Sequence, residues 1–133
     1  LRQGLATSNR LQDILVNNFI VGRTGNEILR SARETAIGEG ILPSIYTHPI
    51  GYHGHGAGPT IGMWDNQGDT LGRGDYPLFE NTAFSIELNS TVSVPEWEGQ
   101  RLRFKLEEDA FFDGRQTLYI DGRQKELILI QSK

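Results

Sequence analysis

The chain has 133 residues, of which 37% are hydrophobic and 23% charged, and its formal net charge at pH 7 is −4. This length suits one domain with a modest core, and an acidic balance without any lysine or arginine run argues against nucleic-acid and membrane partners. No cysteine is present, which excludes disulfides and thiolate metal sites, and no apolar run approaches the ~20 residues that span a bilayer.

The first third of the sequence predicts two amphipathic helices. Apolar residues recur at helical spacing over residues 4–21, which indicates one buried stripe. Its members are Leu5, Leu11, Ile14, Leu15 and Phe19. Thr24 and Glu27 have the spacing of a capping box, so a second helix is expected over residues 26–38. Its expected buried residues are Ile28, Leu29, Ala32, Ala36 and Ile37.

The rest of the sequence predicts strands and one long loop. Residues 58–82 are rich in glycine, proline, aspartate and asparagine, and loops of such length in compact domains are often functional. Strands are expected at residues 83–88, 91–94, 101–106, 111–112, 117–120 and 127–130, whereas residues 41–46 form a short apolar segment interrupted by Pro43. An Asp-Gly turn at 121–122 would join the last two as a hairpin. Two helices followed by antiparallel strands predict an α+β layer, with helices on one face and the site on the other.

All three histidines lie within residues 47–58, where glycines leave the rings of His53 and His55 unshielded. Neutral imidazole is the commonest metal ligand. Glu87 and Glu107 lie on later strands, from which they can reach the same place. Two simpler interpretations compete with a metal site. Each glutamate can belong to the solvated face of its strand. The glycine-rich histidine segment can form only turns, or a surface site that recruits adventitious metal.

Three segments, taken in order, resemble the motifs of the pita-bread metallopeptidases, which include methionine aminopeptidase, Xaa-Pro aminopeptidase and prolidase. They are Gly54-His55-Gly56-Ala57-Gly58, Phe84-Ser85-Ile86-Glu87 and Lys105-Leu106-Glu107-Glu108-Asp109. The helical lead-in at residues 22–28 is similar as well. The resemblance implies an α+β structure that forms half of a pita-bread fold, with two helices packed on a curved antiparallel sheet.

The resemblance also implies a function. His55, Glu87 and Glu107 would bind two divalent metal ions, with Glu107 bridging both. Oxygen ligands with one imidazole suit Mn, Co, Fe or Zn, and a paired site both generates hydroxide and stabilises the oxyanion. The intact enzyme would act on a peptide substrate and remove an N-terminal residue that precedes proline.

The chain departs from the family pattern in three places. The family's two aspartate ligands precede the lead-in helices, so residues 1–133 would form the C-terminal part of a catalytic domain, which by itself holds metal poorly and hydrolyses nothing. The family carries a further histidine seven residues after the ligand, where this chain has Gly62; His53 and His48 are candidates for that catalytic place. Leu88-Asn89 replaces the family's Pro-Gly pair.

Several alternatives stay open. His53 competes with His55 as the ligand. A second alternative keeps the fold without the metal chemistry, as a creatinase-like hydrolase or a non-catalytic peptide-binding module. Gly62, which stands in place of the family's further histidine, favours it. A generic α+β interaction domain predicts that His55, Glu87 and Glu107 do not converge. A half-domain would expose apolar surface, so the expected protein partner is a missing N-terminal half or a second copy of the chain.

Overall fold

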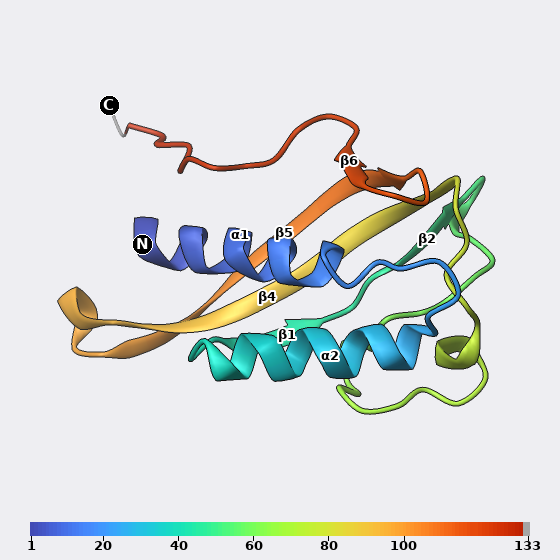
Figure 1. The fold of residues 1–133 in the computed structure, drawn as a ribbon. Helices are drawn as coiled ribbons and strands as arrows, with labels where there is room; N and C mark the ends of the chain where they lie inside the picture. The colour runs from blue at the N-terminus through green and yellow to red at the C-terminus, as the bar shows by residue number, and fades with distance from the viewer. Residues whose placement is uncertain (132–133) are drawn as a thin grey trace.

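The structure is a computed structural model that describes residues 1–131 (Figure 1). Two α-helices lie on one face of an antiparallel sheet, which confirms the predicted α+β class. The sheet has the order β3-β2-β4-β5-β6, and β1 also pairs with β4. Within residues 1–131, no helix combines the length and hydrophobicity that crossing a membrane requires.

The elements follow the chain in a simple order. The helices are α1 (Arg2–Val16) and α2 (Gly25–Gly38), and the short 3₁₀ helices are η1 (Arg73–Asp75) and η2 (Pro95–Trp97). The strands are β1 (Leu42–Ile45), β2 (His48–Gly51), β3 (Gly54–His55), β4 (Thr82–Val94), β5 (Gln100–Phe112) and β6 (Thr117–Tyr119).

The first helix is shorter than the predicted range 4–21. The side-chain amide of Asn18 donates to the carbonyl of Ile14 (2.9 Å), which satisfies an orphan acceptor of the last turn. Phe19 nevertheless stays buried, with its ring centroid 5.0 Å from that of Phe84. The apolar stripe therefore continues into the core after the helix has ended. For this reason the apolar periodicity predicted a helix that ends too late.

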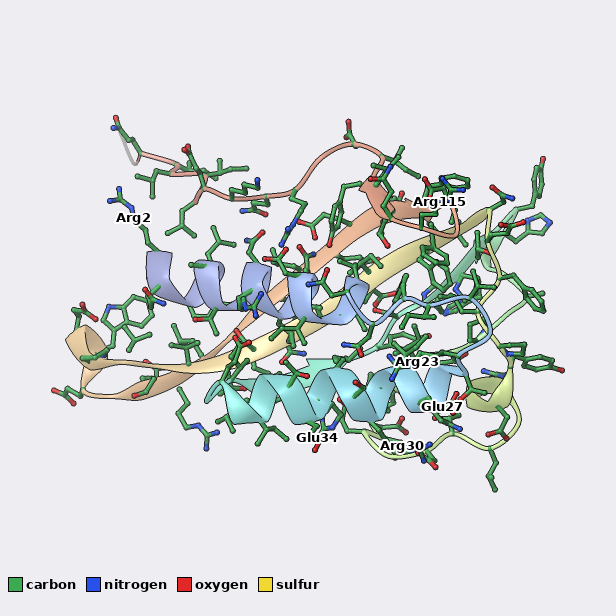
Figure 2. All side chains as sticks on the ribbon, viewed as in Figure 1. Arg2, Arg23, Glu27, Arg30, Glu34 and Arg115 are labelled. Atoms are coloured by element: carbon green, nitrogen blue, oxygen red, sulfur yellow. The ribbon has the colours of Figure 1, made fainter. Side chains whose placement is uncertain are left out.

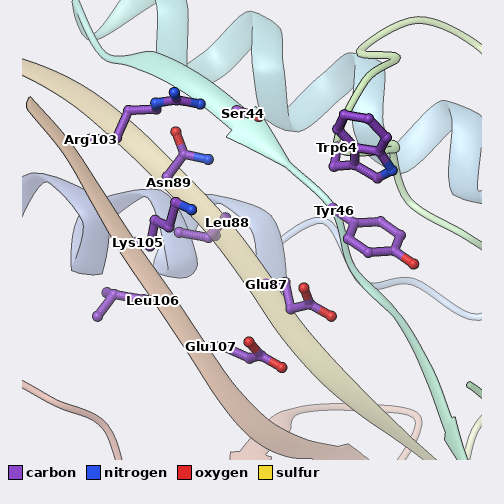
Figure 3. Close-up of a pocket in the computed structure, with 10 residues that line it drawn as sticks. All are labelled: Ser44, Tyr46, Trp64, Glu87, Leu88, Asn89, Arg103, Lys105, Leu106 and Glu107. Carbon is purple, nitrogen blue, oxygen red and sulfur yellow. The ribbon is translucent and has the colours of Figure 1, made fainter. Parts of the chain in front are cut away.

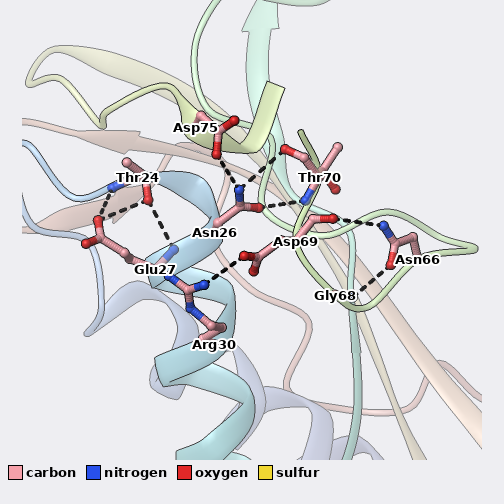
Figure 4. Close-up of polar contacts among 9 residues, drawn as sticks. All are labelled: Thr24, Asn26, Glu27, Arg30, Asn66, Gly68, Asp69, Thr70 and Asp75. Carbon is pink, nitrogen blue, oxygen red and sulfur yellow. Dashed lines mark hydrogen bonds and ion pairs between the residues drawn. The ribbon is translucent and has the colours of Figure 1, made fainter. Parts of the chain in front are cut away.

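The second helix begins with the predicted capping box. The Thr24 hydroxyl accepts from the Glu27 backbone N–H (3.2 Å), and the Glu27 carboxylate accepts from the Thr24 N–H (2.8 Å) (Figure 4). Charged Glu27, Arg30 and Glu34 lie along the outer side of this helix (Figure 2). Ile37 was wrongly assigned to the buried face: it is 55% exposed because it is turned about 100° from the last buried position. The buried members are Ile28, Leu29, Ala32 and Ala36.

Two long strands form the centre of the sheet. β4 and β5 pair along all 13 residues of each, so the break expected at 89–90 is absent and the strand predicted at 101–106 extends through Glu107 to Phe112. Ser90 is buried, and its backbone N–H donates to the Ser8 hydroxyl of α1 (3.2 Å). This contact with the helix layer stabilises the polar Asn-Ser pair within the strand.

Residues 120–131 form no strand, so the strand predicted at 127–130 is wrong. Gly122 has a positive φ of 85°, as the expected turn requires, but the chain then runs along α1 (Figure 1). Arg123 fixes this path, because its guanidinium donates to the Asp13 carboxylate (2.6 Å) and to the Asn9 carbonyl (2.6 Å). Contacts with the helix thus replace the expected hairpin.

The hydrophobic core lies between the helix layer and the inner face of the sheet. On β4, Phe84, Ile86 and Leu88 are buried against it, as the alternation of the sequence predicted. Glu87 has the opposite orientation and is only partly buried. The face of the sheet away from the helices is therefore available for a polar site.

Candidate functional site

Two carboxylates lie directly opposite each other on the open face of the sheet. Glu87 of β4 is the register partner of Glu107 of β5. Figure 3 shows both side chains extending to the same side, near Tyr46. Like charges directly opposite each other in a sheet repel, so this pair by itself is unfavourable for folding.

His48 is held through both of its ring nitrogens. Nδ1 lies 2.9 Å from the carbonyl oxygen of Pro49; a carbonyl can only accept, so Nδ1 carries a proton. Nε2 lies 2.8 Å from Oε1 of Glu87, a contact that requires one proton shared between imidazole and carboxylate. The Pro49 carbonyl also accepts from the Gly56 N–H (2.7 Å), which ties the β2–β3 hairpin to this histidine.

His55 lies beside His48 and not beside the glutamates. The two imidazoles stack with ring centroids 4.0 Å apart, and His55 Nε2 lies 2.7 Å from the Tyr46 hydroxyl. Within residues 1–131, His55 forms no hydrogen bond to Glu87 or Glu107. The structure therefore brings His55, predicted as the ligand, to the site through His48 and Tyr46.

His53 lies at the exposed turn between β2 and β3. Its ring makes an edge-to-face contact with Tyr52, with centroids 4.7 Å apart. Neither cavity beside the glutamates and histidines is lined by His53. Of the two histidines predicted to have a catalytic role, His48 is thus the one that contacts a carboxylate of residues 1–131.

The first cavity contains the glutamate pair. Its volume is about 510 Å³, and its walls carry both signs of charge, with Arg103 and Lys105 alongside Glu87 and Glu107 (Figure 3). The indole of Trp64, from the long loop, forms another wall. This cavity is suited to charged and hydrogen-bonding groups.

The second cavity, of about 870 Å³, adjoins the first and contains both stacked histidines. Tyr46 lines both cavities, Tyr76 and Phe79 add aromatic walls, and the run 56–58 leaves a wall nearly free of side chains. Arg73 is the one permanently charged residue of the described chain that lines this cavity. An apolar ligand with a negative group fits such walls.

The Tyr46 phenol lies at the boundary of the two cavities. Its partial burial, and next the negative charge of Glu87, raise the pKa of Tyr46, while the charge of Arg73 acts in the opposite direction. The hydroxyl is therefore protonated at neutral pH and available as a hydrogen-bond donor. The sequence had not marked this residue, although alternation along residues 44–48 places Tyr46 and His48 on one face.

The donor set for a metal ion is partial. Within residues 1–131, no three histidine, aspartate or glutamate side chains gather closely enough to hold an ion. His48 and Glu87 are in direct contact, and Glu107 lies across from Glu87 on the neighbouring strand. The chain thus offers two contacting donors with a third beside them.

No protein-family model and no curated protein matches the sequence. In fold, the chain is similar to the X-Pro aminopeptidase from Thermotoga maritima, with a TM-score of 0.65 at 20% sequence identity. The chain shares its fold with a peptidase. The match covers 96% of this chain and 33% of the aminopeptidase, so the chain spans about a third of the length of that protein.

Proposed function

We propose that the chain supplies one histidine and two glutamates to the metal centre of an aminopeptidase or dipeptidase that cleaves Xaa-Pro bonds. The observation that carries this proposal is the 2.8 Å contact between His48 Nε2 and Glu87, with Glu107 directly opposite Glu87. The likeness in fold to an X-Pro aminopeptidase supports the peptidase class.

His48 has the surroundings of a metal ligand. A metal-binding histidine usually donates its other N–H to a carbonyl or carboxylate, and Nδ1–H of His48 has the Pro49 carbonyl as its acceptor. Nε2 is left with one proton shared with Glu87, and a metal ion would displace this proton. We therefore assign the ligand role to His48.

The spacing of the histidines supports the same assignment. The resembled family carries a second histidine seven residues after its ligand, and position 55 is seven residues after position 48. With His48 as ligand, His55 takes this second place, and Gly62 no longer marks a missing histidine. In that case the family's ligand histidine corresponds to His48, and the motif match at His55 lies seven residues too far along the chain.

The site would combine metal chemistry with peptide binding. Bound divalent ions, of which Mn, Co, Fe and Zn suit these donors, would supply a hydroxide and stabilise the oxyanion. His48, Glu87 and Glu107 would hold them. The second cavity would accept the peptide: its aromatic walls pack against an apolar ring such as proline, and Arg73 binds a carboxylate.

The backbone of Arg73 is well fixed for this task. The Asn26 side chain donates to Asp75 (2.8 Å) and accepts from the Thr70 N–H (2.8 Å) (Figure 4). The Gly74 N–H donates to the Thr70 carbonyl (2.9 Å). A Cβ at Gly74 would collide with Asn26. The turn that carries Arg73 is thus held against the start of α2.

The second candidate function keeps the fold without the metal chemistry, as a peptide-binding module or a creatinase-like hydrolase. One observation favours it: no three candidate donors gather within residues 1–131. In that case the proton between His48 and Glu87 would be permanent, and divalent ions would not compete for it.

Titration of the chain with MnCl₂ by calorimetry distinguishes the two candidates. We expect weak, saturable binding with proton release, and an affinity at least tenfold lower for His48→Ala and Glu87→Gln, as loss of a ligand implies. His53→Ala is the matched control and should bind like the wild type. Equal binding by His48→Ala would contradict the ligand assignment, and measurable Xaa-Pro hydrolysis by the chain alone would refute the expected incompleteness of the site.

A further inference from the structure

We propose that Tyr46 is a positioning residue that fixes the tautomer of His55, so that His55 offers its Nδ1–H as a donor to an oxygen of a peptide in the second cavity. The identity of the ligand as a peptide rests on the proposed function. The tautomer does not depend on it, because the residues that set it are all contained in this chain.

The first step is the polarity of the contact between the two side chains. The Tyr46 hydroxyl lies 2.7 Å from His55 Nε2, and within residues 1–131 it has no other hydrogen-bond partner. A phenol is a strong neutral donor, and the unprotonated nitrogen of imidazole is a better acceptor than a phenol oxygen. The hydroxyl therefore donates and Nε2 accepts, which places the proton of the neutral ring on Nδ1.

The second step is the rigidity of the arrangement. The Tyr46 backbone N–H donates to the Glu87 carbonyl (3.0 Å), so the tyrosine is anchored beside β4. Its ring centroid lies 5.3 Å from that of His48, whose ring in turn stacks on His55. His55 is thus held at its edge by the phenol and on its face by His48, and a donor fixed in this way loses little entropy when it binds a ligand.

The third step concerns the nitrogen that remains. His55 is exposed and lines the second cavity, and among residues 1–131 its Nδ1 has no hydrogen-bond partner. An oxygen of a carbonyl or carboxylate group has the acceptor chemistry that an Nδ1–H requires.

The test is nitrogen NMR of the ¹⁵N-labelled chain without metal, at about pH 8.5, where ordinary imidazoles are neutral. We expect the Nδ1–H form of His55 in the wild type. Tyr46→Phe keeps the ring but removes the donor, and we expect the ratio of Nδ1–H to Nε2–H to fall about tenfold, the upper range for one hydrogen bond. Tyr76→Phe is the matched control, since Tyr76 lines the same cavity, and it should leave the tautomer unchanged.

A second arm tests the donor role with glycyl-proline as the probe. Millimolar probe should shift the Nδ1 proton of His55 downfield in the wild type and much less in Tyr46→Phe. An Nε2–H tautomer in the wild type, an unchanged tautomer in Tyr46→Phe, or an unperturbed Nδ1–H in the presence of the probe would each overturn the proposal. Because no metal is added, failure of the manganese titration alone leaves these results standing, and the two proposals can fail separately.

Discussion

At the scale of single residues, the open face of the sheet carries charges that do not favour folding. Glu87 and Glu107 are register partners, and their like charges repel across the strands. Functional sites commonly retain such unfavourable pairs at a cost in stability. The stability of the metal-free chain should therefore rise when one charge is removed.

We expect Glu107→Gln to stabilise the metal-free chain by roughly 0.2–1 kcal/mol, toward the lower end because Glu107 is exposed and solvent screens its charge. Urea unfolding measures this change. Glu96→Gln, which removes an equal charge at the exposed η2 turn, is the control and should have little effect. A less stable Glu107→Gln would mean that Glu107 has a stabilising partner instead.

Tyr119 gives a second prediction, on the alkaline side. Burial raises the pKa of Tyr119 to about 12, and among residues 1–131 its hydroxyl has no hydrogen-bond partner. The tyrosine of the unfolded chain ionises near pH 10, while that of the folded chain stays neutral. The contribution of Tyr119 to the free energy of unfolding is therefore present below about pH 10 and is lost between about pH 10 and 12.

Tyr119→Phe should therefore remove that alkaline loss, which amounts to ~2 kcal/mol or less after solvent screening. At pH 7 the variant should be at least as stable as the wild type, because it also removes an unsatisfied buried hydroxyl. Thermal unfolding at pH 7, 10 and 11.5 measures both effects. An alkaline loss of the same size in the variant would assign the loss to other groups.

At the scale of elements, α1 packs closely on the sheet at one point. Gly4 contacts Phe104 of β5, and a Cβ built at this glycine would collide with the ring. Gly4→Ala should therefore destabilise the chain by about 1–3 kcal/mol, as overpacking does, although alanine favours helix. Gly38→Ala in α2, where a Cβ meets nothing within 4 Å, should be neutral or slightly stabilising. Similar unfolding midpoints for the two variants would show that α1 can move away from the sheet.

The elements also show how far the sequence alone could lead. The capping box at Thr24 and the alternation along β4 are local patterns, and both were predicted correctly. The path after β6 was not, because it depends on Arg123 binding Asp13, a residue 110 positions away. Sequence patterns over a few neighbouring residues carry no information about a contact between residues so far apart.

The candidate site shows the same limit. Glu87 and Glu107 were predicted as ligands from motifs, whereas the contact of His48 with Glu87 depends on how β2 lies beside β4. The sequence motif predicted His55 as the ligand, with His53 as the alternative, and gave no reason to prefer His48, which belongs to the same hairpin. Tyr46 had no motif, and its role follows only from the 2.7 Å contact that folding creates.

At the scale of the whole molecule, apolar side chains remain at the surface. Exposed residues gather after β6, where Ile128 is 83% and Ile130 93% exposed. Large apolar side chains exposed within one short segment are available for burial in protein contacts. This observation supports the expectation of a companion segment or of self-association, which remains a proposal.

Sedimentation velocity over a range of concentrations tests that proposal. We expect the wild type to associate as concentration rises, and the double variant Ile128→Asp/Ile130→Asp to sediment as a monomer, because two carboxylates oppose apolar contact and repel each other between copies. Leu71→Asp is the matched control, since Leu71 is 89% exposed but lies in the long loop before η1. If the wild type sediments as a monomer throughout, a second copy is excluded as the partner of this surface. If Leu71→Asp abolishes association equally, the contact lies elsewhere or depends only on net charge.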